Sequence, residues 1–434
     1  MKDLSLFQIV VLMIFTLCLM AGVFFLAIYR APQNEGQVQV GSIEIWGTFS
    51  GDAMNTYLRE MRNQNETFER ISYREFSDQD FNQELLVALA EGRSPDLLLL
   101  SNAQVYQNRN RILALQPDVL SRRDYRNEYL EIAEAYYWND GILGLPFIVD
   151  PMIMFWNRNI FTSAGLVNPP ATWSEVSNLS TEITERDENL NITKATVAMG
   201  EARNVTYFKE LLSTFALQFY NPITTVINGD FMSALAGDQQ RAIPSAESAF
   251  NYFTRFSNTA GDSYTWNRSL PESETYFLGG NLALHFGFAS DIQSLQMRNP
   301  NLNFDIAEMP QLEGTDLPSV YADLYGFFIP RGAPDANRAY VAMNLLTSSQ
   351  SANAISEITS LTSARRDFSP SGNQDFTEMF RKEAVYARTF IDPDYAATNA
   401  IFQNAVENIT SGRRSVSEAL NLADAEIDAI ISNN

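Results

Sequence analysis

Residues 141–176 read GILGLPFIVDPMIMFWNRNIFTSAGLVNPPATWSEV. Two strand-like apolar runs in this stretch, residues 143–149 and 152–156, meet at Asp150 and Pro151. Both runs are rich in the large apolar side chains that sheets bury. The stretch therefore predicts two buried strands with a single carboxylate at their junction.

Helix signals follow the second run. Residues 157–165 end in a glycine and predict a short helix. Two prolines then lead to Thr172 and Ser174, and either hydroxyl can cap the next helix. We interpret Trp156 and Trp173 as core side chains, because tryptophan is mostly buried in folded proteins.

Asp150 has two interpretations. A carboxylate between two apolar runs must be hydrogen-bonded or paired if it is buried. A bound ligand can satisfy it, and so can a backbone cap. Asp150 is therefore a candidate binding residue and equally a candidate structural one.

The succession of GLPF, WN, AGL, PP and TW within residues 144–173 resembles the extracellular solute-binding proteins of the maltose-binding type. These are the receptors that deliver sugars and other solutes to ABC importers. Residues 277–287, FLGGNLALHFG, resemble the segment in which the chain of that family returns to its first lobe. The resemblance covers most of residues 42–430 and implies a two-lobed α/β fold of the type II periplasmic-binding-protein class, with Asp150 at the cleft.

Local patterns independently indicate an α/β fold. Residues 42–46 alternate between polar and apolar side chains and predict a strand that leads through a tight loop into a helix. Residues 71–76 and 97–100 predict further strands, with a helix over residues 77–92 between them that ends in a glycine. Alternating strands and helices imply a sheet with right-handed crossovers.

The amino-terminal region predicts a transmembrane anchor. Residues 6–29 are an apolar segment of 24 residues, which at about 1.5 Å each can cross a hydrocarbon core of roughly 30 Å. No suitable small-residue cleavage site follows it. We expect residues 1–5 to be a cytoplasmic tip and residues 30–41 to be an extracytoplasmic tether.

The resemblance also implies how the rest of the chain divides. We expect lobe I to contain residues 42–149 and 287–333. We expect lobe II to contain residues 150–286 and 334–434.

Composition narrows the class of protein. The 434 residues are too many for one ordinary core and suit two lobes. The net charge of −22 argues against binding to nucleic acid or to an anionic membrane surface. The one cysteine, Cys18, lies in the predicted anchor, so we expect no disulfide framework.

Catalytic and metal-binding signals are few. His285, the one histidine, lies in an apolar run and is interpreted as a satisfied core residue. No GxSxG, HExxH, Walker or Rossmann pattern stands in a suitable context. Asp150 can be paired with Asp323 or Asp291 as in a glycosidase, but the sequence does not give their separation. We expect no cofactor, no metal and no enzymatic activity.

The resemblance implies ligand contacts from both lobes and from the crossing between them. The expected binding residues are Thr48, Phe49, Ser50, Asn102, Gln104, Asp150, Asn204, Tyr207, Phe286, Phe288 and Tyr325. Sugar binders of that family often place tryptophans here, whereas this chain offers Phe and Tyr, which argues against a long maltodextrin. Trp266 is interpreted either as packed or as a mobile aromatic near the mouth of the cleft.

The expected function is that of a membrane-tethered, extracytoplasmic solute-binding protein. It would capture a sugar or oligosaccharide by lobe closure, about crossings at residues 149–152 and 284–287, and deliver it to the permease subunits of an ABC importer. Two alternatives stay open. One is a polysaccharide-processing enzyme on the same scaffold, and the other is a receptor that presents its ligand to a separate membrane sensor.

Overall fold

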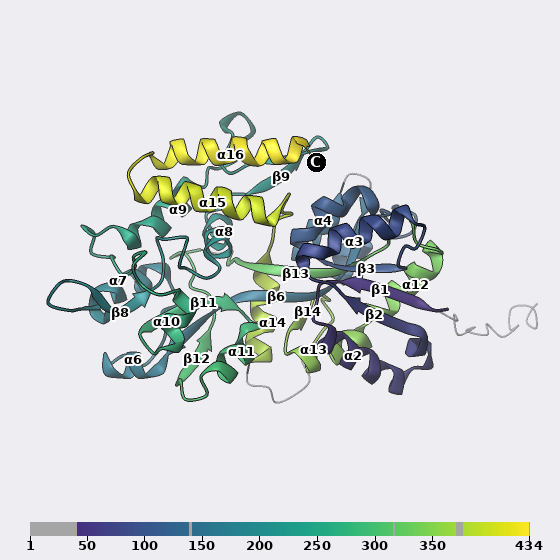
Figure 1. Cartoon of the computed structure of the whole chain (residues 1–434), viewed down its shortest axis with the longest axis horizontal. Helices are drawn as coiled ribbons and strands as arrows, with labels where there is room; N and C mark the ends of the chain where they lie inside the picture. The colour runs from purple at the N-terminus through teal and green to yellow at the C-terminus, as the bar shows by residue number, and fades with distance from the viewer. Residues whose placement is uncertain (1–40, 139–140, 316, 370–375, 434) are drawn as a thin grey trace, which may run out of the picture.

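The computed structural model describes residues 41–138, 141–315, 317–369 and 376–433. They form two α/β lobes that lie side by side, with β6 (Gly144–Asn157) and β13 (Val320–Phe328) running between them (Figure 1). The predicted anchor at residues 6–29 lies outside the described residues. Within that part of the chain, no helix combines the length and the apolar character needed to cross a membrane.

The elements before β6 are β1 (Ile43–Gly47), α2 (Gly51–Gln64), β2 (Ile71–Glu75), α3 (Asp78–Ala90), β3 (Leu97–Ser101), α4 (Asn102–Asn108), α5 (Arg122–Glu128), β4 (Tyr137–Trp138) and β5 (Gly141–Ile142). Between β6 and β13 lie α6 (Arg158–Ser163), α7 (Trp173–Ile183), β7 (Glu185–Arg186), β8 (Ile192–Val197), α8 (Phe208–Gln218), β9 (Thr224–Ile227), β10 (Asp230–Ser233), α9 (Glu247–Thr254), α10 (Ser273–Leu278), β11 (Leu282–Phe288), α11 (Asp291–Arg298) and β12 (Phe304–Ala307). After β13 come α12 (Ala336–Leu346), α13 (Ser349–Thr359), β14 (Thr362–Ser363), α14 (Thr377–Tyr386), β15 (Ala387–Arg388), α15 (Tyr395–Thr410) and α16 (Val416–Asn433).

β6 is a single strand that passes through both lobes, and all 14 of its residues are buried. Its first half pairs antiparallel with β13, and its second half pairs antiparallel with β11 and β12. The prediction of two separate strands is therefore wrong. Pro151 fits inside the strand because proline is compatible with extended backbone, and its carbonyl oxygen still accepts a hydrogen bond from the amide of Ala289.

The second crossing is β13, and not residues 284–287 as expected. Those residues belong to β11, which pairs with the second half of β6 and with β8. β14 also pairs with β6, and β15 pairs with β13. The junction between the lobes is thus one continuous patch of sheet rather than two isolated linkers.

The first lobe is built on the sheet order β2-β1-β3-β13-β6. β1, β2 and β3 are parallel, so the loops after β1 and β3 emerge at the same edge. Ser50 and Ser77 accept hydrogen bonds from amides in the first turns of α2 and α3, which explains where these helices begin. The predicted alternation of strands and helices is confirmed here.

The second lobe packs around Trp173, which is fully buried as predicted. Its indole Nε1 donates a hydrogen bond of 2.6 Å to Gln218 Oε1, and its ring lies 4.4 Å from Phe215 and 5.4 Å from Phe286 between centroids. Thr172 caps α7 with a complete capping box, so the choice between the two candidate caps falls on Thr172.

The division of the chain between the lobes differs from the expected one at two places. β11 and β12 pair with residues 152–157 of β6, in the second lobe. α12 and α13 lie beside the first-lobe helix α2, where the Tyr57 hydroxyl donates to the carbonyl oxygen of Leu346. We therefore propose that residues 287–319 belong to the second lobe and residues 334–363 to the first.

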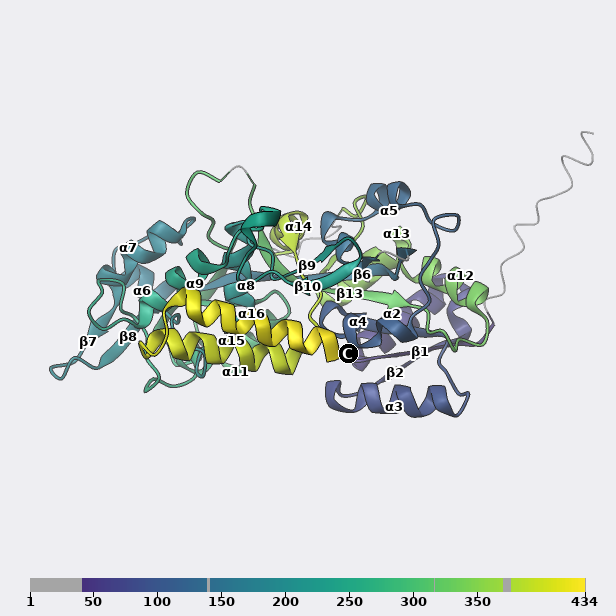
Figure 2. The same cartoon turned by 90° about the horizontal axis from the view of Figure 1, so that it is seen from above.

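The carboxyl-terminal helices α15 and α16 lie side by side over the second lobe (Figure 2). Ser415 and Glu418 form a capping box before α16, with reciprocal hydrogen bonds of 2.9 and 3.3 Å. Next to α16, the β9–β10 hairpin turns at Asn228 and Gly229, both of which have positive φ as this type of tight turn requires.

Replacing Gly144 by alanine should destabilise the junction of the lobes. An added Cβ would lie 2.5 Å from the carbonyl oxygen of Phe327 and 2.5 Å from the ring of Phe328, so β13 would have to shift. Overpacking of this kind costs about 1–3 kcal/mol. Urea unfolding followed by circular dichroism should show that loss.

Gly261→Ala is the matched control, because the atom nearest to its added Cβ is 3.4 Å away, an ordinary contact. It should unfold close to the urea concentration of the wild type. A Gly144→Ala protein as stable as this control would contradict the close approach of β6 and β13.

Candidate ligand-binding site

Two carboxylates meet where the crossing strands pair. The register of β13 and β6 places Asp323 directly opposite Asp150. Side chains at opposite positions of an antiparallel pair share one face of the sheet, with Cβ atoms about 4.5–5.5 Å apart. The crossing therefore brings a buried and a half-buried acidic group together at the junction of the lobes.

Asp150 is held by a backbone donor. Its Oδ1 accepts a hydrogen bond of 3.1 Å from the amide of Ser290, which follows β11. This is the backbone cap that the sequence left as one of two alternatives. The Ser290 side chain also bonds this carboxylate, and these bonds use only part of its capacity, because a carboxylate can accept about four hydrogen bonds.

Tyr207, from the second lobe, contacts Asp291, the third acidic group in this region. It has a left-handed backbone (φ 56°, ψ 31°) immediately before α8, which costs a non-glycine residue about 1–2 kcal/mol. Its hydroxyl donates a hydrogen bond of 3.1 Å to Asp291 Oδ1, and Asp291 Oδ2 accepts one of 2.9 Å from the amide of Phe288. Strained positions of this kind cluster at functional sites.

Aromatic rings line this region from both lobes. Phe49, in the loop after β1, makes an edge-to-face contact with Tyr325 at 5.0 Å between centroids. Phe288 lies 4.9 Å from the ring of Tyr207 and 6.3 Å from that of Tyr321. Aromatic faces beside polar groups are the chemistry that binds a ligand with both apolar and hydroxyl-bearing surfaces.

Polar side chains at the ends of β1 and β3 complete the first-lobe side. Thr48 Oγ1 and Gln104 Oε1 are 3.2 Å apart, and Gln104 Nε2 donates to Asp78 Oδ1 at 3.0 Å. Asn102 Oδ1 accepts from the amide of Leu324, and its Nδ2 donates to the Tyr321 hydroxyl at 3.1 Å. These bonds fix the side chains in place before any ligand arrives.

Among the residues that the structure describes, none forms an ion pair with Asp150 or Asp323. Burial raises the pKa of Asp150 to about 8, and the charges of Asp323 and Asp291 add to the rise. Burial together with the Glu210 carboxylate raises the pKa of Asp323 to about 7. The charge of Lys209, whose Nζ lies 2.7 Å from Asp392 Oδ2, offsets only part of the rise at Asp323. At neutral pH the pair therefore retains protons and can donate as well as accept hydrogen bonds.

Three of the expected binding residues are used for structure. Ser50 caps α2, and Phe286 packs on Trp173 in the second-lobe core. Asn204 Nδ2 donates to the carbonyl oxygens of Asn267 and Leu270, at 2.9 and 3.0 Å. We therefore leave these three side chains out of the candidate site.

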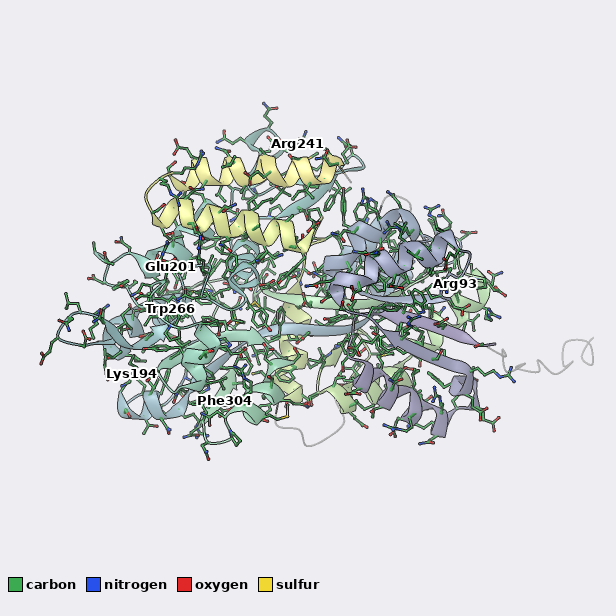
Figure 3. The ribbon with its side chains drawn as sticks, in the orientation of Figure 1. Arg93, Lys194, Glu201, Arg241, Trp266 and Phe304 are labelled. Atoms are coloured by element: carbon green, nitrogen blue, oxygen red, sulfur yellow. The ribbon has the colours of Figure 1, made fainter. Side chains whose placement is uncertain are left out.

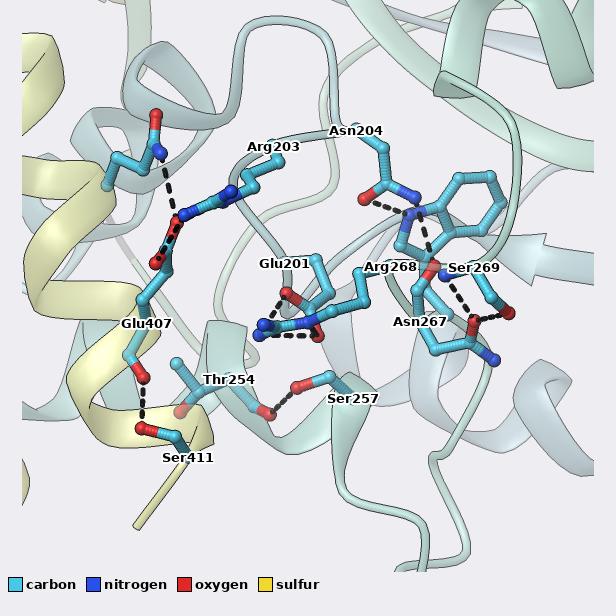
Figure 4. A network of polar contacts seen from close by, with 12 residues as sticks. Glu201, Arg203, Asn204, Thr254, Ser257, Asn267, Arg268, Ser269, Glu407 and Ser411 are labelled. Carbon is cyan, nitrogen blue, oxygen red and sulfur yellow. Dashed lines mark hydrogen bonds and ion pairs between the residues drawn. The ribbon is translucent and has the colours of Figure 1, made fainter. Parts of the chain in front are cut away.

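Trp266 is a fixed core residue and not a mobile aromatic. It is fully buried within the second lobe (Figure 3), and its Nε1 donates to Asn204 Oδ1 at 3.2 Å. Two ion pairs lie near Asn204, because Arg203 pairs with Glu407 and Arg268 pairs with Glu201 (Figure 4). These polar contacts hold the loops that precede α8 and α10 in position.

Asp291, Tyr321 and Asp323 lie in the candidate site but were not among the expected binding residues. Glu210 was not expected either, and it acts on the pKa of Asp323 from outside the site. A signal for Tyr321 was present, because residues 321, 323 and 325 alternate along a strand and must share one face. For Glu210 the sequence held no such signal, since its place beside Asp323 depends on how α8 packs on β13. The candidate site is defined here as Thr48, Phe49, Asn102, Gln104, Asp150, Tyr207, Phe288, Asp291, Tyr321, Asp323 and Tyr325.

His285 is buried, as predicted, but it is not satisfied. Its ring lies 5.4 Å from Phe277 and 5.9 Å from Phe155, and Nε2 has no hydrogen-bond partner among the described residues. Burial lowers the pKa of His285 to about 3, so the ring is neutral. The described part of the chain brings no three His, Cys, Asp or Glu side chains together in a way that could hold a metal ion.

Comparison with protein-family models gives no match for this sequence, and comparison with curated proteins gives none either. Solved structures do match. The cyclic alpha-maltosyl-1,6-maltose binding protein from Arthrobacter globiformis aligns with a TM-score of 0.72 at 15% identity, over 90% of this chain and 99% of that one.

Two further structures align over a similar extent. The sugar-binding protein MalE from the phytopathogen Xanthomonas citri gives a TM-score of 0.72 at 17% identity, over 90% of this chain and 97% of that one. The extracellular solute-binding protein from Staphylococcus aureus, in complex with maltose, gives 0.69 at 16% identity, over 90% and 98%. The chain thus has the two-lobed α/β fold of the maltose-binding type of solute-binding protein.

Proposed function

We propose that this protein is an extracytoplasmic solute-binding protein that captures a sugar or oligosaccharide between its lobes and delivers it to the permease subunits of an ABC importer. The observation that carries the proposal is the convergence of aromatic rings and hydrogen-bonding groups from both lobes on the Asp150–Asp323 pair. Sugars present hydroxyls at their edges and C–H groups on their faces. Such a surface suits carboxyl groups and aromatic rings together.

Lobe closure is the mechanism that this arrangement favours. Phe49 and Tyr325 belong to the first-lobe sheet and its loops, whereas Tyr207 and Phe288 belong to the second lobe. A ligand that contacts both sets binds the closed arrangement more tightly than the open one, and this difference in affinity drives closure. Because β6 and β13 carry the junction, small backbone changes in these strands suffice to rotate the lobes.

Membrane attachment forms the second part of the proposal. Residues 6–29 would hold the lobes at the outer face of the membrane, with residues 30–41 as the tether. Attachment would keep the captured solute close to the permease.

The second candidate function is glycoside hydrolysis, and the Asp150–Asp323 pair is the observation that favours it. Asp150 and Asp323 stand directly opposite each other, and burial raises the pKa of both. Retaining glycosidases use two carboxyl groups about 5–5.5 Å apart. Reducing-end assays with oligosaccharides that bind the protein separate the two functions, because a transport receptor releases its ligand unchanged.

Alanine at Tyr325 should weaken sugar binding. Removing the ring deletes an aromatic contact and exposes the edge of Phe49, which should lower affinity about tenfold. A thermal-shift screen of mono- and oligosaccharides on the wild type identifies the sugar, because a ligand at a hundred times its Kd adds about 2.7 kcal/mol of stability. Calorimetric titration then compares the variants.

Tyr220→Ala is the control for this substitution, since Tyr220 is 55% exposed and lies outside the candidate site. It should bind the sugar as the wild type does. Wild-type affinity in both Tyr325→Ala and Asp150→Ala would reject the candidate site, and the absence of any binding sugar would reject the ligand class.

Stability should decrease as the pH rises from about 6.5 to 8, which is the upper part of a decline that begins near pH 4. The pKa values of Asp150 and Asp323, about 8 and about 7, lie above those of an unfolded chain, so the folded state binds the extra protons. Their contribution is complete below about pH 4 and is lost as the pH passes through the folded values. In Asp150→Asn the decrease should be shallower, by up to about 1.4 kcal/mol per pH unit, when urea unfolding is measured across this range.

Asp187→Asn serves as the control. Hydrogen bonds from Asn191 lower the pKa of this exposed carboxylate, so its titration lies well below the measured range and its curve should run parallel to the wild type. His285 opposes the trend only below about pH 6.5, because its lowered pKa makes the folded state bind fewer protons there. An Asp150→Asn curve parallel to the wild type would contradict the raised pKa of Asp150.

The anchor should remain on the mature protein. Amino-terminal sequencing of protein from the producing cell should give a start before residue 6, and the chain should fractionate with membranes. Deleting residues 1–41 should move it to the soluble fraction with sugar binding intact. A mature chain that begins after Ala31 would show that the segment is removed.

A further inference from the structure

Three aromatic side chains meet where the two lobes touch beside the candidate site. Phe231 on β10 lies 4.7 Å from the ring of Tyr106 on α4, between centroids. It also lies 5.3 Å from Trp138 on β4, and Trp138 lies 6.1 Å from Tyr106. We call Tyr106, Trp138 and Phe231 the aromatic clasp.

The clasp joins elements from different lobes. Tyr106 and Trp138 belong to the first lobe, through α4 and the β4–β5 pair. Phe231 belongs to the β9–β10 hairpin, which α16 holds: the amide of Ser233 donates to Asp428 Oδ1 at 2.7 Å. Both views show this hairpin reaching from the second lobe toward α4 (Figures 1 and 2).

A hydrogen bond reinforces the ring contacts. The Tyr106 hydroxyl donates to the carbonyl oxygen of Ile431, near the end of α16, at 3.2 Å. The Arg109 guanidinium lies 3.6 Å from the centre of the same ring and fixes it from within the first lobe. Tyr106 is only 2% exposed, so its ring has little freedom apart from these contacts.

The clasp is close to the candidate site along α4. Asn102 and Tyr106 are four residues apart and share one face of the helix, about one turn or 6 Å from each other. Asn102 contacts Tyr321 and the amide of Leu324 on the crossing strand. A contact that holds Tyr106 against the second lobe therefore also sets the spacing between the two walls of the site.

We propose that the aromatic clasp holds the lobes in their closed arrangement through contacts of the protein alone. Each aromatic pair changes the equilibrium constant between the open and closed arrangements about two- to tenfold. Two pairs across the lobes include Phe231, one with Tyr106 and one with Trp138. A protein closed in this way binds its ligand more tightly, because less of the binding energy is used to bring the lobes together.

The test measures the distance between the lobes without added sugar, so its result does not depend on the proposed ligand. Nitroxide labels are placed on Leu86→Cys, on α3 of the first lobe, and on Val167→Cys, in the second lobe, in the full chain with Cys18→Ser. These sites are 53% and 82% exposed. Double electron–electron resonance on purified protein in detergent should give one dominant distance. In Phe231→Ala, the ratio of open to closed molecules should rise about tenfold or more.

Trp138→Ala approaches the same contact from the first lobe and should open the lobes in the same way. Phe304→Ala is the matched control, because Phe304 is also half-buried and packs on Phe155 and Phe277, all within the second lobe (Figure 3). Its distance distribution should equal that of the wild type. Cooperative thermal unfolding in each variant confirms that it is folded. Unchanged distances in both Phe231→Ala and Trp138→Ala would overturn the proposal.

Discussion

The antiparallel pairing of β6 with β13 is the contact on which the rest of the structure depends. β6 contributes its first half to one lobe and its second half to the other, and every residue in it is buried. β13 covers the first half and turns its other edge to β3. Because both strands pair with neighbours on each side, one continuous sheet joins the two lobes.

This pairing also creates the chemistry of the candidate site. An antiparallel register sets directly opposite residues side by side, so Asp150 and Asp323 must meet once the strands are aligned. Two carboxyl groups held together in a buried place resist ionisation. Burying two carboxyl groups together is electrostatically unfavourable. The pair lies where both lobes supply aromatic rings. A neutral, hydroxyl-rich ligand bound there would form hydrogen bonds with groups that both donate and accept.

Predictions from local sequence were correct where neighbouring residues decide the structure, as at a helix cap. Thr172, one of the two expected caps, does cap the helix that follows it, and Trp173 is buried. They failed at Pro151, where two separate strands were expected although the chain continues as one strand. The lobe to which α12 and α13 belong could not be read locally, because either lobe offers an apolar surface to an amphipathic helix and only packing places them beside α2.

The sequence by itself determined the alternation of strands and helices, the apolar crossing stretch and the acidic residue within it, since these follow from side-chain type and spacing. Only the tertiary structure decided which groups meet there. Asp323 opposite Asp150, Glu210 beside Asp323, and Phe231 against Tyr106 each join residues far apart in the chain. Their contacts depend on strand register and helix packing, which are set by the burial of whole elements and are not encoded in any local run of residues.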